Sequence, residues 1–381
     1  LLEEQLGSQA MEQLMIEPPA NPLDAGNFQT SAETGAISRD RRLLDARRNL
    51  EVQLQGQPQR PSLGLAMPLQ WRHQEIQDVA VLNPEAIQTL NLWLHAPQSD
   101  WLKRQGIEAG EWCDAVEDLS PLSMDELDRH RLIRERLAEQ LDHLAEHPET
   151  RWDHIDHVDW RVRCCGQGLM PPGAAAALDQ DRLQQRWQNL QHTLFSLGPV
   201  HQLQSDSNTL NTGQLMAGEL AVHISTSKLR ARTLLQAWLQ HLLVQLGNAP
   251  CSSAVICRPE GSAKADQFQI AMRWQTMAPQ EAAHQIAQLQ GLAAQGAEQC
   301  WPVPPESGLA RALALAKGQD AADRAFTNRW QGGFSLWAER DQAQLSLCFG
   351  DGCDAQQLLQ DPGFKTAFAS LYQPLLEARC Q

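Results

Sequence analysis

The stretch "HISTSKLRARTLLQAWLQHLL", residues 223–243, joins a β-prone segment to an apolar helix through a short basic turn. The residues before Lys228 suit the end of a strand, and leucines recur after it at helical spacing. Gly247 supplies a stop signal. The sequence therefore predicts a strand, a tight turn and a helix over residues 230–246, with Lys228 at the junction.

The segments on either side extend this pattern into a sheet. A helix ending at Gly198 is predicted over 178–198. Three β-prone stretches follow it, at 199–205, 213–218 and 219–225. After the helix 230–246 come two more β-prone stretches, at 252–258 and 268–274. Antiparallel strands followed by a helix and another strand indicate a sheet covered by helices. We therefore expect an α/β fold, of the mixed α+β kind, with a large helical portion.

The remaining segments are mostly helical and are separated by linkers rich in proline and glycine. Helices are predicted at 1–16, 38–54, 83–96, 123–147, 279–295, 308–330 and 364–378, and a hairpin at 333–350. A chain of 381 residues usually contains two or three domains. We expect 1–60 to hold an N-terminal helix, a linker and a basic helix, 61–165 to be mainly helical, and 166–381 to hold the α/β core, C-terminal helices and hairpin.

The net charge of −15 argues against a surface that is basic throughout. Contact with nucleic acid would have to be local, at "RDRRLLDARR" (39–48) or at "KLRAR" (228–232). The first run is most simply a solvated helix face, because Asp40 and Asp45 alternate with its arginines.

Other bulk features bear on the compartment. No apolar run approaches the roughly 20 residues of a membrane helix, and the N-terminus lacks the features of a signal peptide. The nine cysteines show no CxxC spacing, so we expect a cytoplasmic protein. The missing initial methionine suggests a fragment of a longer protein.

The sequence lacks the motifs of several common kinds of active site. There is no GxxxxGK[ST] loop, no GxGxxG and no GxSxG, so we predict neither nucleotide binding nor a serine nucleophile, and no cofactor. The strongest apparent metal signal is "WDHIDHVDW" at 152–160, where His154 and His157 lie among Asp153, Asp156 and Asp159. Without a further ligand from elsewhere, this stretch suits an amphipathic edge segment better, and we predict no metal. His241 suits packing better than catalysis, because the surrounding helix is apolar.

The basic turn can be compared with the active sites of metal-dependent nucleases. One large class carries an acidic residue two positions before a lysine at such a junction, and carboxylates there hold Mg²⁺. Here that position is Thr226. The junction thus keeps Lys228 and lacks the metal site, so no catalytic residue is predicted. The alternative is an active metal nuclease whose acids are Asp206, Glu219 or the cluster at 153–159.

Several soft motifs occur in an order that resembles one family. They are "NPLDAGNF", "ISRDRRLLDARRNL", "WLHAPQSDWLKRQGI", "GLMPPGAAA" and "SKLRARTLLQAWLQHLLVQL", with a weaker match at "FKTAFASLYQPLLEAR". The chain resembles the C-terminal part of the gamma subunit of exodeoxyribonuclease V (RecC). "NPLDAGNF" departs from the family by lacking the usual aromatic residue and serine.

The resemblance implies a specific fold and role. The fold would be a restriction-endonuclease-like core, of the PD-(D/E)xK type, that has lost its catalytic carboxylates. The role would be a noncatalytic subunit of a helicase and nuclease complex in DNA repair and recombination, which helps to split the duplex and to route single strands. Its partners would be forked or single-stranded DNA and RecB-like and RecD-like subunits, with no membrane.

Six basic residues are candidates for DNA contact. They are Lys228, Arg230 and Arg232 at the junction and Arg39, Arg41 and Arg42 in the basic helix. Such side chains position a phosphate backbone without reading its sequence. Surface solvation or an ion pair with a partner subunit is the alternative for the junction residues. A third possibility for the whole chain is a protein-interaction module without DNA contact, which the acidic balance and twelve tryptophans permit.

Overall fold

The structure is a computed structural model of the chain. It describes residues 23–28, 30–31, 35–36, 40–55, 71, 80–109, 124–147, 149–165, 167–170, 173–203, 214–247, 249–261, 266–333, 337–350 and 352–380. The chain forms two compact units, Leu1–Gly64 and Leu65–Gln381, and each is described by itself. The expected helix at 1–16 lies outside the described residues, as do Arg39 and Asp206. The finer division of the chain at residues 60 and 165 stays a prediction.

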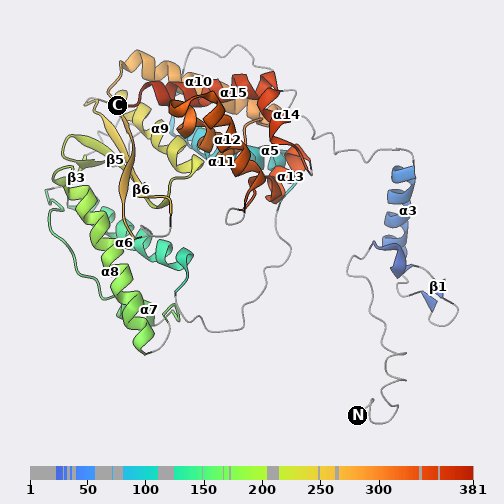
Figure 1. Cartoon of the computed structure of the whole chain (residues 1–381), viewed down its shortest axis with the longest axis horizontal. Coiled ribbons are helices and arrows are strands. Elements are labelled where there is room, and N and C mark those ends of the chain that lie inside the picture. Colours follow the sequence, from blue (N-terminus) through green and yellow to red (C-terminus); the bar gives the residue numbers. More distant parts are fainter. Residues whose placement is uncertain are drawn as a thin grey trace, which may run out of the picture. The chain divides into compact units, whose positions relative to one another are not determined.

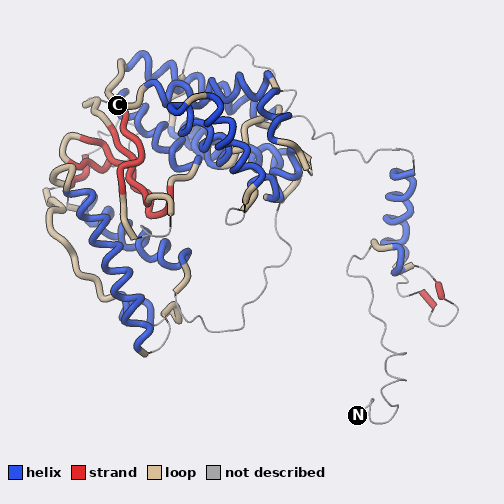
Figure 2. The backbone as a smooth tube through the Cα atoms, viewed as in Figure 1, coloured by secondary structure: helices blue, strands red, loops and turns tan. Residues whose placement is uncertain are grey.

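A five-stranded sheet forms the centre of the unit Leu65–Gln381 (Figure 2, red). Its strands occur in chain order: β3 (Val200–Leu203), β4 (Gln214–Ala217), β5 (Leu220–Lys228), β6 (Ser253–Arg258) and β7 (Gln269–Trp274). Only β5 and β6 pair in parallel, and α9 (Ala231–Gln245) connects them. The predicted order of helix, three strands, helix and strand is confirmed, and so is the mixed α/β class.

Helices cover both faces of the sheet (Figure 1). On one face, α6 (Glu126–Glu146), α7 (Trp160–Cys165) and α8 (Ala174–Phe195) enclose a core that includes Ile256 of β6. On the other, α4 (Pro84–His95), α5 (Pro97–Arg104), α9 and α10 (Pro279–Glu298) enclose a core that includes Val255. Successive residues of a strand point to opposite faces, so neighbouring residues of β6 enter different cores.

The helix α9 is buried on nearly every side. Its sequence places leucine, alanine or tryptophan on all faces, which is typical of a helix inside a core rather than at a surface. Tryptophans fill much of the interior, among them Trp93, Trp187, Trp238 and Trp274. Only Trp337 is highly exposed among the described tryptophans, at 92%. The described tryptophans therefore mainly stabilise the core. They give little support to the alternative that the chain is a protein-interaction module.

Helices complete the C-terminal part of this unit (Figure 1, orange and red). They are α11 (Pro305–Ala314), η4 (Leu315–Lys317), α12 (Gln319–Gln331), η5 (Glu339–Asp341), α13 (Ala343–Phe349), α14 (Ala355–Gln360) and α15 (Pro362–Glu377). The predicted terminal helix is thus confirmed, and Gly318, with φ 101°, divides the helical segment expected at 308–330.

The hairpin predicted at 333–350 is wrong over its described residues 339–349, which form η5 and α13. Leu345, Cys348 and Phe349 are all buried, and their spacing places them on one helical face. In a stretch this short, Leu345, Leu347 and Phe349 also fit the alternation of a strand, so periodicity did not separate the two structures.

The unit Leu1–Gly64 holds η1 (Ala25–Asn27), a two-stranded ribbon of β1 (Thr30–Ser31) and β2 (Gly35–Ala36), and α3 (Arg41–Gln55). The predicted basic helix corresponds to α3. Among the described residues of the whole chain, no helix has both the length and the apolar character needed to cross a membrane.

Candidate functional site

The strand-to-helix junction at the end of β5 is built from two neighbouring parallel strands. Lys228 is the last residue of β5, and it lies in register with Arg258, the last residue of β6. The helix α9 begins three residues after Lys228, and Arg230 is its N-cap in an extended conformation. The carboxyl ends of parallel strands meet at one edge of the sheet, so both cations and the start of α9 belong to the same edge.

A carboxylate from another helix caps α9. The backbone N–H of Ala231 donates to Oε1 of Glu306, in the first turn of α11, at 3.2 Å. The Nη1 atom of Arg230 lies 3.7 Å from Oε2 of the same carboxylate. Glu306 thus accepts a hydrogen bond from an N–H group at the N-terminus of α9, where an acidic group is generally stabilising. The same carboxylate offsets part of the charge of Arg230.

Arg232 keeps its positive charge without a carboxylate contact among the described residues. Its Nη1 atom lies 3.3 Å from Nε2 of His95, at the end of α4. Burial and the charge of Arg232 both lower the pKa of His95. The imidazole is therefore neutral at pH 7, and its Nε2 accepts the hydrogen bond from the guanidinium. This contact positions Arg232 and leaves its charge available to an anion.

Thr226 is tied into the fold rather than open to a ligand. Its side chain is 2% exposed, and Oγ1 lies 2.6 Å from Nδ1 of His130 on α6. Burial lowers the pKa of His130 although a hydrogen bond with the backbone of Thr226 raises it, and the charges of Arg134 and Arg258 add to the lowering. A hydroxyl paired with a neutral imidazole therefore fills the position where a metal-binding carboxylate would stand.

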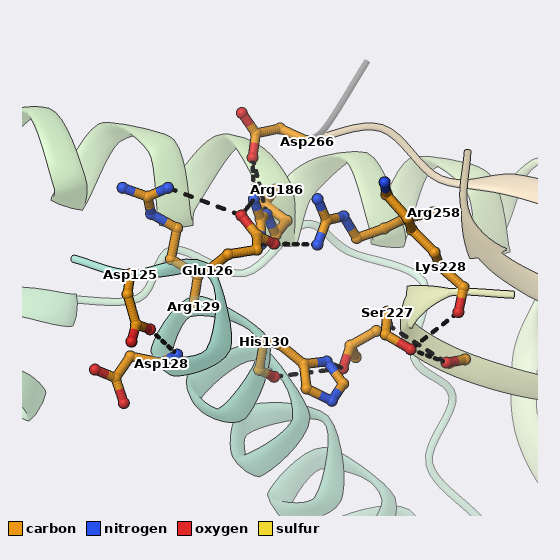
Figure 3. A network of polar contacts seen from close by, with 12 residues as sticks. Asp125, Glu126, Asp128, Arg129, His130, Arg186, Ser227, Lys228, Arg258 and Asp266 are labelled. Atoms are coloured by element: carbon orange, nitrogen blue, oxygen red, sulfur yellow. Dashed lines mark hydrogen bonds and ion pairs between the residues drawn. The ribbon is translucent and has the colours of Figure 1, made fainter. Parts of the chain in front are cut away.

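The carboxylate of Glu126 also lies at this edge, but arginines hold it (Figure 3). Nη1 and Nη2 of Arg186 donate to the two oxygens of Glu126 at 2.8 and 3.1 Å, and Arg258 donates to the same carboxylate. Burial raises the pKa of Glu126, but the hydrogen bonds and charges of Arg186 and Arg258 outweigh it, and the pKa lies below its ordinary value. The carboxylate is thus ionised, and its charge is already neutralised by guanidinium groups.

A second acid completes this network (Figure 3). Asp266, before β7, accepts from Nε of Arg186 at 2.8 Å, and the Arg186 side chain is only 1% exposed. Beside it, Arg129 donates to Asp179 of α8 at 2.9 Å. The network ties α6 and α8 to the edge of the sheet that carries Lys228.

The family model of the RecC C-terminal domain matches residues 84–316, which is more than half of the chain. The chain belongs to the RecC C-terminal domain family. A search of curated proteins found no match. The matched range includes the whole sheet, α9 and the arginine network.

The described alternative metal ligands of this RecC C-terminal domain do not form a metal site, and Asp206 lies outside the described residues. Glu219 precedes the first residue of β5, whereas Lys228 is the last, so the strand separates them by nearly its full length. No group of three or more metal-ligating side chains lies within bonding geometry among the residues that the structure describes.

The cluster at 153–159 is not helical, so His154 and His157 do not form the helical pair that would present two ligands. Arg136 binds Asp156 at 3.1 Å, and Asp159 accepts from the backbone of Arg161 at the start of α7. These contacts fit the interpretation of an ordinary edge segment.

The predicted DNA contacts fall into two groups. Lys228 is partly exposed and lies 3.5 Å from the exposed Glu260, a contact that contributes little in water. Arg41 and Arg42 begin α3 in the other unit and are exposed, while Arg47 pairs with Glu51 along the same helix. The structure thus groups Lys228, Arg230 and Arg232, and nothing relates that group to α3.

A polar cavity of about 430 Å³ opens beside Arg232 and Arg230. Its wall includes Glu339 of η5, which is 1% exposed and accepts from the backbone N–H groups of Glu306 and Ser307 at 2.8 and 2.6 Å. Burial raises the pKa of Glu339 to about 7 despite these hydrogen bonds. The sequence alone did not indicate this residue, because its segment was predicted to form a hairpin.

The sequence alone also did not indicate Glu126, Arg186 and Arg258. Glu126 carries a local signal, since it follows the N-cap Asp125 at the start of a predicted helix. Nothing local shows that its partners lie 60 and 132 residues further along the chain.

Proposed function

We propose that this chain is a noncatalytic part of an exodeoxyribonuclease V complex of the RecBCD type, acting in double-strand break repair and recombination. Its role would be that of a scaffold that helps to split the duplex and to route single strands. Its partners would be DNA and RecB-like and RecD-like subunits, in the cytoplasm. Membership of the RecC C-terminal domain family supports this proposal.

We also propose that the sheet and its helices form a restriction-endonuclease-like core within residues 166–381. The observation that carries the noncatalytic assignment is the buried pair of Thr226 and His130. The hydroxyl occupies the position two residues before Lys228, and the carboxylate of Glu126 in the network is bound by two arginines. Because proteins usually bind Mg²⁺ through carboxylates, a hydroxyl at this position and a carboxylate already bound by arginines support the proposal that the junction has no metal site.

Local positive charge supports phosphate contact at the junction. The chain as a whole is acidic, yet the charge of Arg232 helps to lower the pKa of both His95 and His130. Two separate imidazoles thus experience the positive potential of this guanidinium. We propose that Lys228, Arg230 and Arg232 contact the phosphate backbone. Arg39, Arg41 and Arg42 are proposed as a second, separate contact.

A cleavage assay tests the noncatalytic assignment. The chain is incubated with end-labelled forked DNA in Mg²⁺ or Mn²⁺, with a chelator control, and the products are resolved on a denaturing gel. We expect the DNA to remain intact. Cleavage that copurifies with the chain and stops on chelation would instead support an active metal nuclease.

A binding assay tests the phosphate contact. Affinity for forked DNA is measured between low and moderate salt for the original chain and for Lys228→Gln with Arg232→Gln. Each lost phosphate contact should reduce the slope of log K against log salt concentration by about 0.7 to 0.9. The control pair, Lys317→Gln with Arg324→Gln, removes two exposed charges near α12. Equal slopes for the two double variants would refute the contact.

A further inference from the structure

A groove lies between α11 and α15, outside the junction described above. Its volume is about 390 Å³, and its lining is mostly apolar. The lining comprises side chains of α11, η4 and α15, namely Arg311, Leu315, Lys365, Phe368, Ala369, Gln373, Leu376 and Glu377. The residues from α15 recur at intervals of three and four, so they form one stripe along that helix.

The floor of the groove is held in place. The guanidinium of Arg311 lies 4.4 Å from the ring centre of Phe368, and its Nε donates to Asp323 at 3.0 Å. A cation over an aromatic face is attractive, and the ion pair fixes the orientation of the guanidinium. The groove is therefore formed before any partner binds, which lowers the cost of binding.

The charges at the two ends of the stripe oppose the dipole of their own helix. Lys365 is an exposed cation in the first turns of α15, and Glu377 is an exposed anion at its last residue. A helix N-terminus carries partial positive charge and a C-terminus partial negative charge, so the opposite placement would stabilise α15. The carboxylate of the N-cap Asp361 already satisfies the N-terminus of α15, yet Lys365 and Glu377 on the stripe are both placed against the helix dipole. This placement indicates that the two charges serve an interaction.

We propose that this groove binds an amphipathic helix of a partner protein, lying parallel to α15, with acidic residues at its N-terminal end and basic residues at its C-terminal end. The apolar face of that helix packs on the partly exposed Leu315, Ala369 and Leu376, beside the buried Phe368. Its acidic end faces Lys365, and its basic end faces Glu377. In the parallel orientation these charges also suit the partner's own dipole, whereas the antiparallel orientation would place the partner's charges against it.

The length of the stripe sets the size of the partner. Lys365 and Glu377 are twelve residues apart along α15, which corresponds to about 18 Å of helix. A segment of three to four turns therefore contacts both ends. The apolar floor supplies most of the affinity, and the two charges set the direction in which the helix lies.

Designed peptides test the proposal with the full chain. Two labelled 16-residue helices share one leucine face and one composition. The first carries Glu in its first turn and Lys in its last, and the second carries the reverse. Binding is followed by fluorescence anisotropy for the original chain and for the double variant Lys365→Glu with Glu377→Lys. The substitutions place favourable charges at both ends of α15, so the variant remains folded.

We expect the original chain to prefer the first peptide and the double variant to shift that preference by about tenfold toward the second. Comparing the ratio of affinities between the two proteins cancels any difference in the helicity of the free peptides. An unchanged ratio, or no binding of either peptide, would overturn the proposal.

A groove-filling variant provides an independent measurement. Ala369 is half-buried in the stripe, and Ala369→Trp places an indole in the groove. We expect at least a tenfold loss of affinity for both peptides, with the stability of the chain checked by urea unfolding. Undiminished binding to this variant would place the peptides elsewhere on the surface and overturn the proposal.

Discussion

Replacing Glu126 by glutamine should destabilise the unit Leu65–Gln381, because Glu126 is the acceptor shared by two nearly buried arginines. The change removes a negative charge that receives two hydrogen bonds from Arg186 and one from Arg258. Breaking a fully buried ion pair costs about 3–5 kcal/mol. The Glu126 side chain is 51% exposed, so solvent screens part of this, and Arg186 retains Asp266. We therefore expect a loss of about 2 kcal/mol in the free energy of unfolding.

The assay is urea unfolding of the full chain, followed by tryptophan fluorescence, because Trp187 is buried one residue after Arg186 on α8. The matched control is Glu135→Gln, the same chemical change on the same helix. Glu135 contacts Arg131 at 3.7 Å with both side chains more than two-fifths exposed, so its loss should cost less than about 1 kcal/mol. If Glu126→Gln costs no more than the control, the arginine network does not stabilise the fold in the way we infer.

Three further outcomes follow from other contacts. Burial lowers the pKa of His241 to about 4, below its value of about 6.5 in the unfolded chain. The contribution of His241 to the free energy of unfolding should therefore be full above pH 6.5 and decline by up to about 3 kcal/mol as the pH falls to 4. His241→Gln should remove that part of the decline in pH-dependent unfolding, and an identical decline would contradict the assignment. Thr226→Val should cost about 1–2 kcal/mol in urea, because it removes the hydroxyl partner of His130 in a buried site; no loss would show that this contact is unimportant. Gly296→Ala should lower the melting temperature, because the Cβ of the new alanine would lie 2.9 Å from Cε2 of Trp93 and overpacking costs about 1–3 kcal/mol. An unchanged or higher melting temperature would show that the indole can move.

The strand-to-helix junction at Lys228 was predictable where it depends on local sequence. The strand, turn and helix around Lys228 are encoded within about twenty-five residues, and the structure places β5 and α9 where the pattern indicated. The absence of an acid two positions before Lys228 could also be seen directly. The partners of these residues could not, because His95, His130 and Glu306 come from three separate helices.

The sequence by itself determined the class of fold, the order of helices and strands in the sheet region, and the loss of an acidic residue at the junction. These properties depend on hydrophobic periodicity, on turn residues and on the identity of a single side chain, all of which are local. Only the tertiary structure decided that Glu126 lies between Arg186 and Arg258, that Arg232 rests on a neutral His95, and that the segment 339–349 is helical. The first two depend on chain segments far apart in sequence, and the third depends on which apolar residues the core buries, so each is settled only when the whole chain packs.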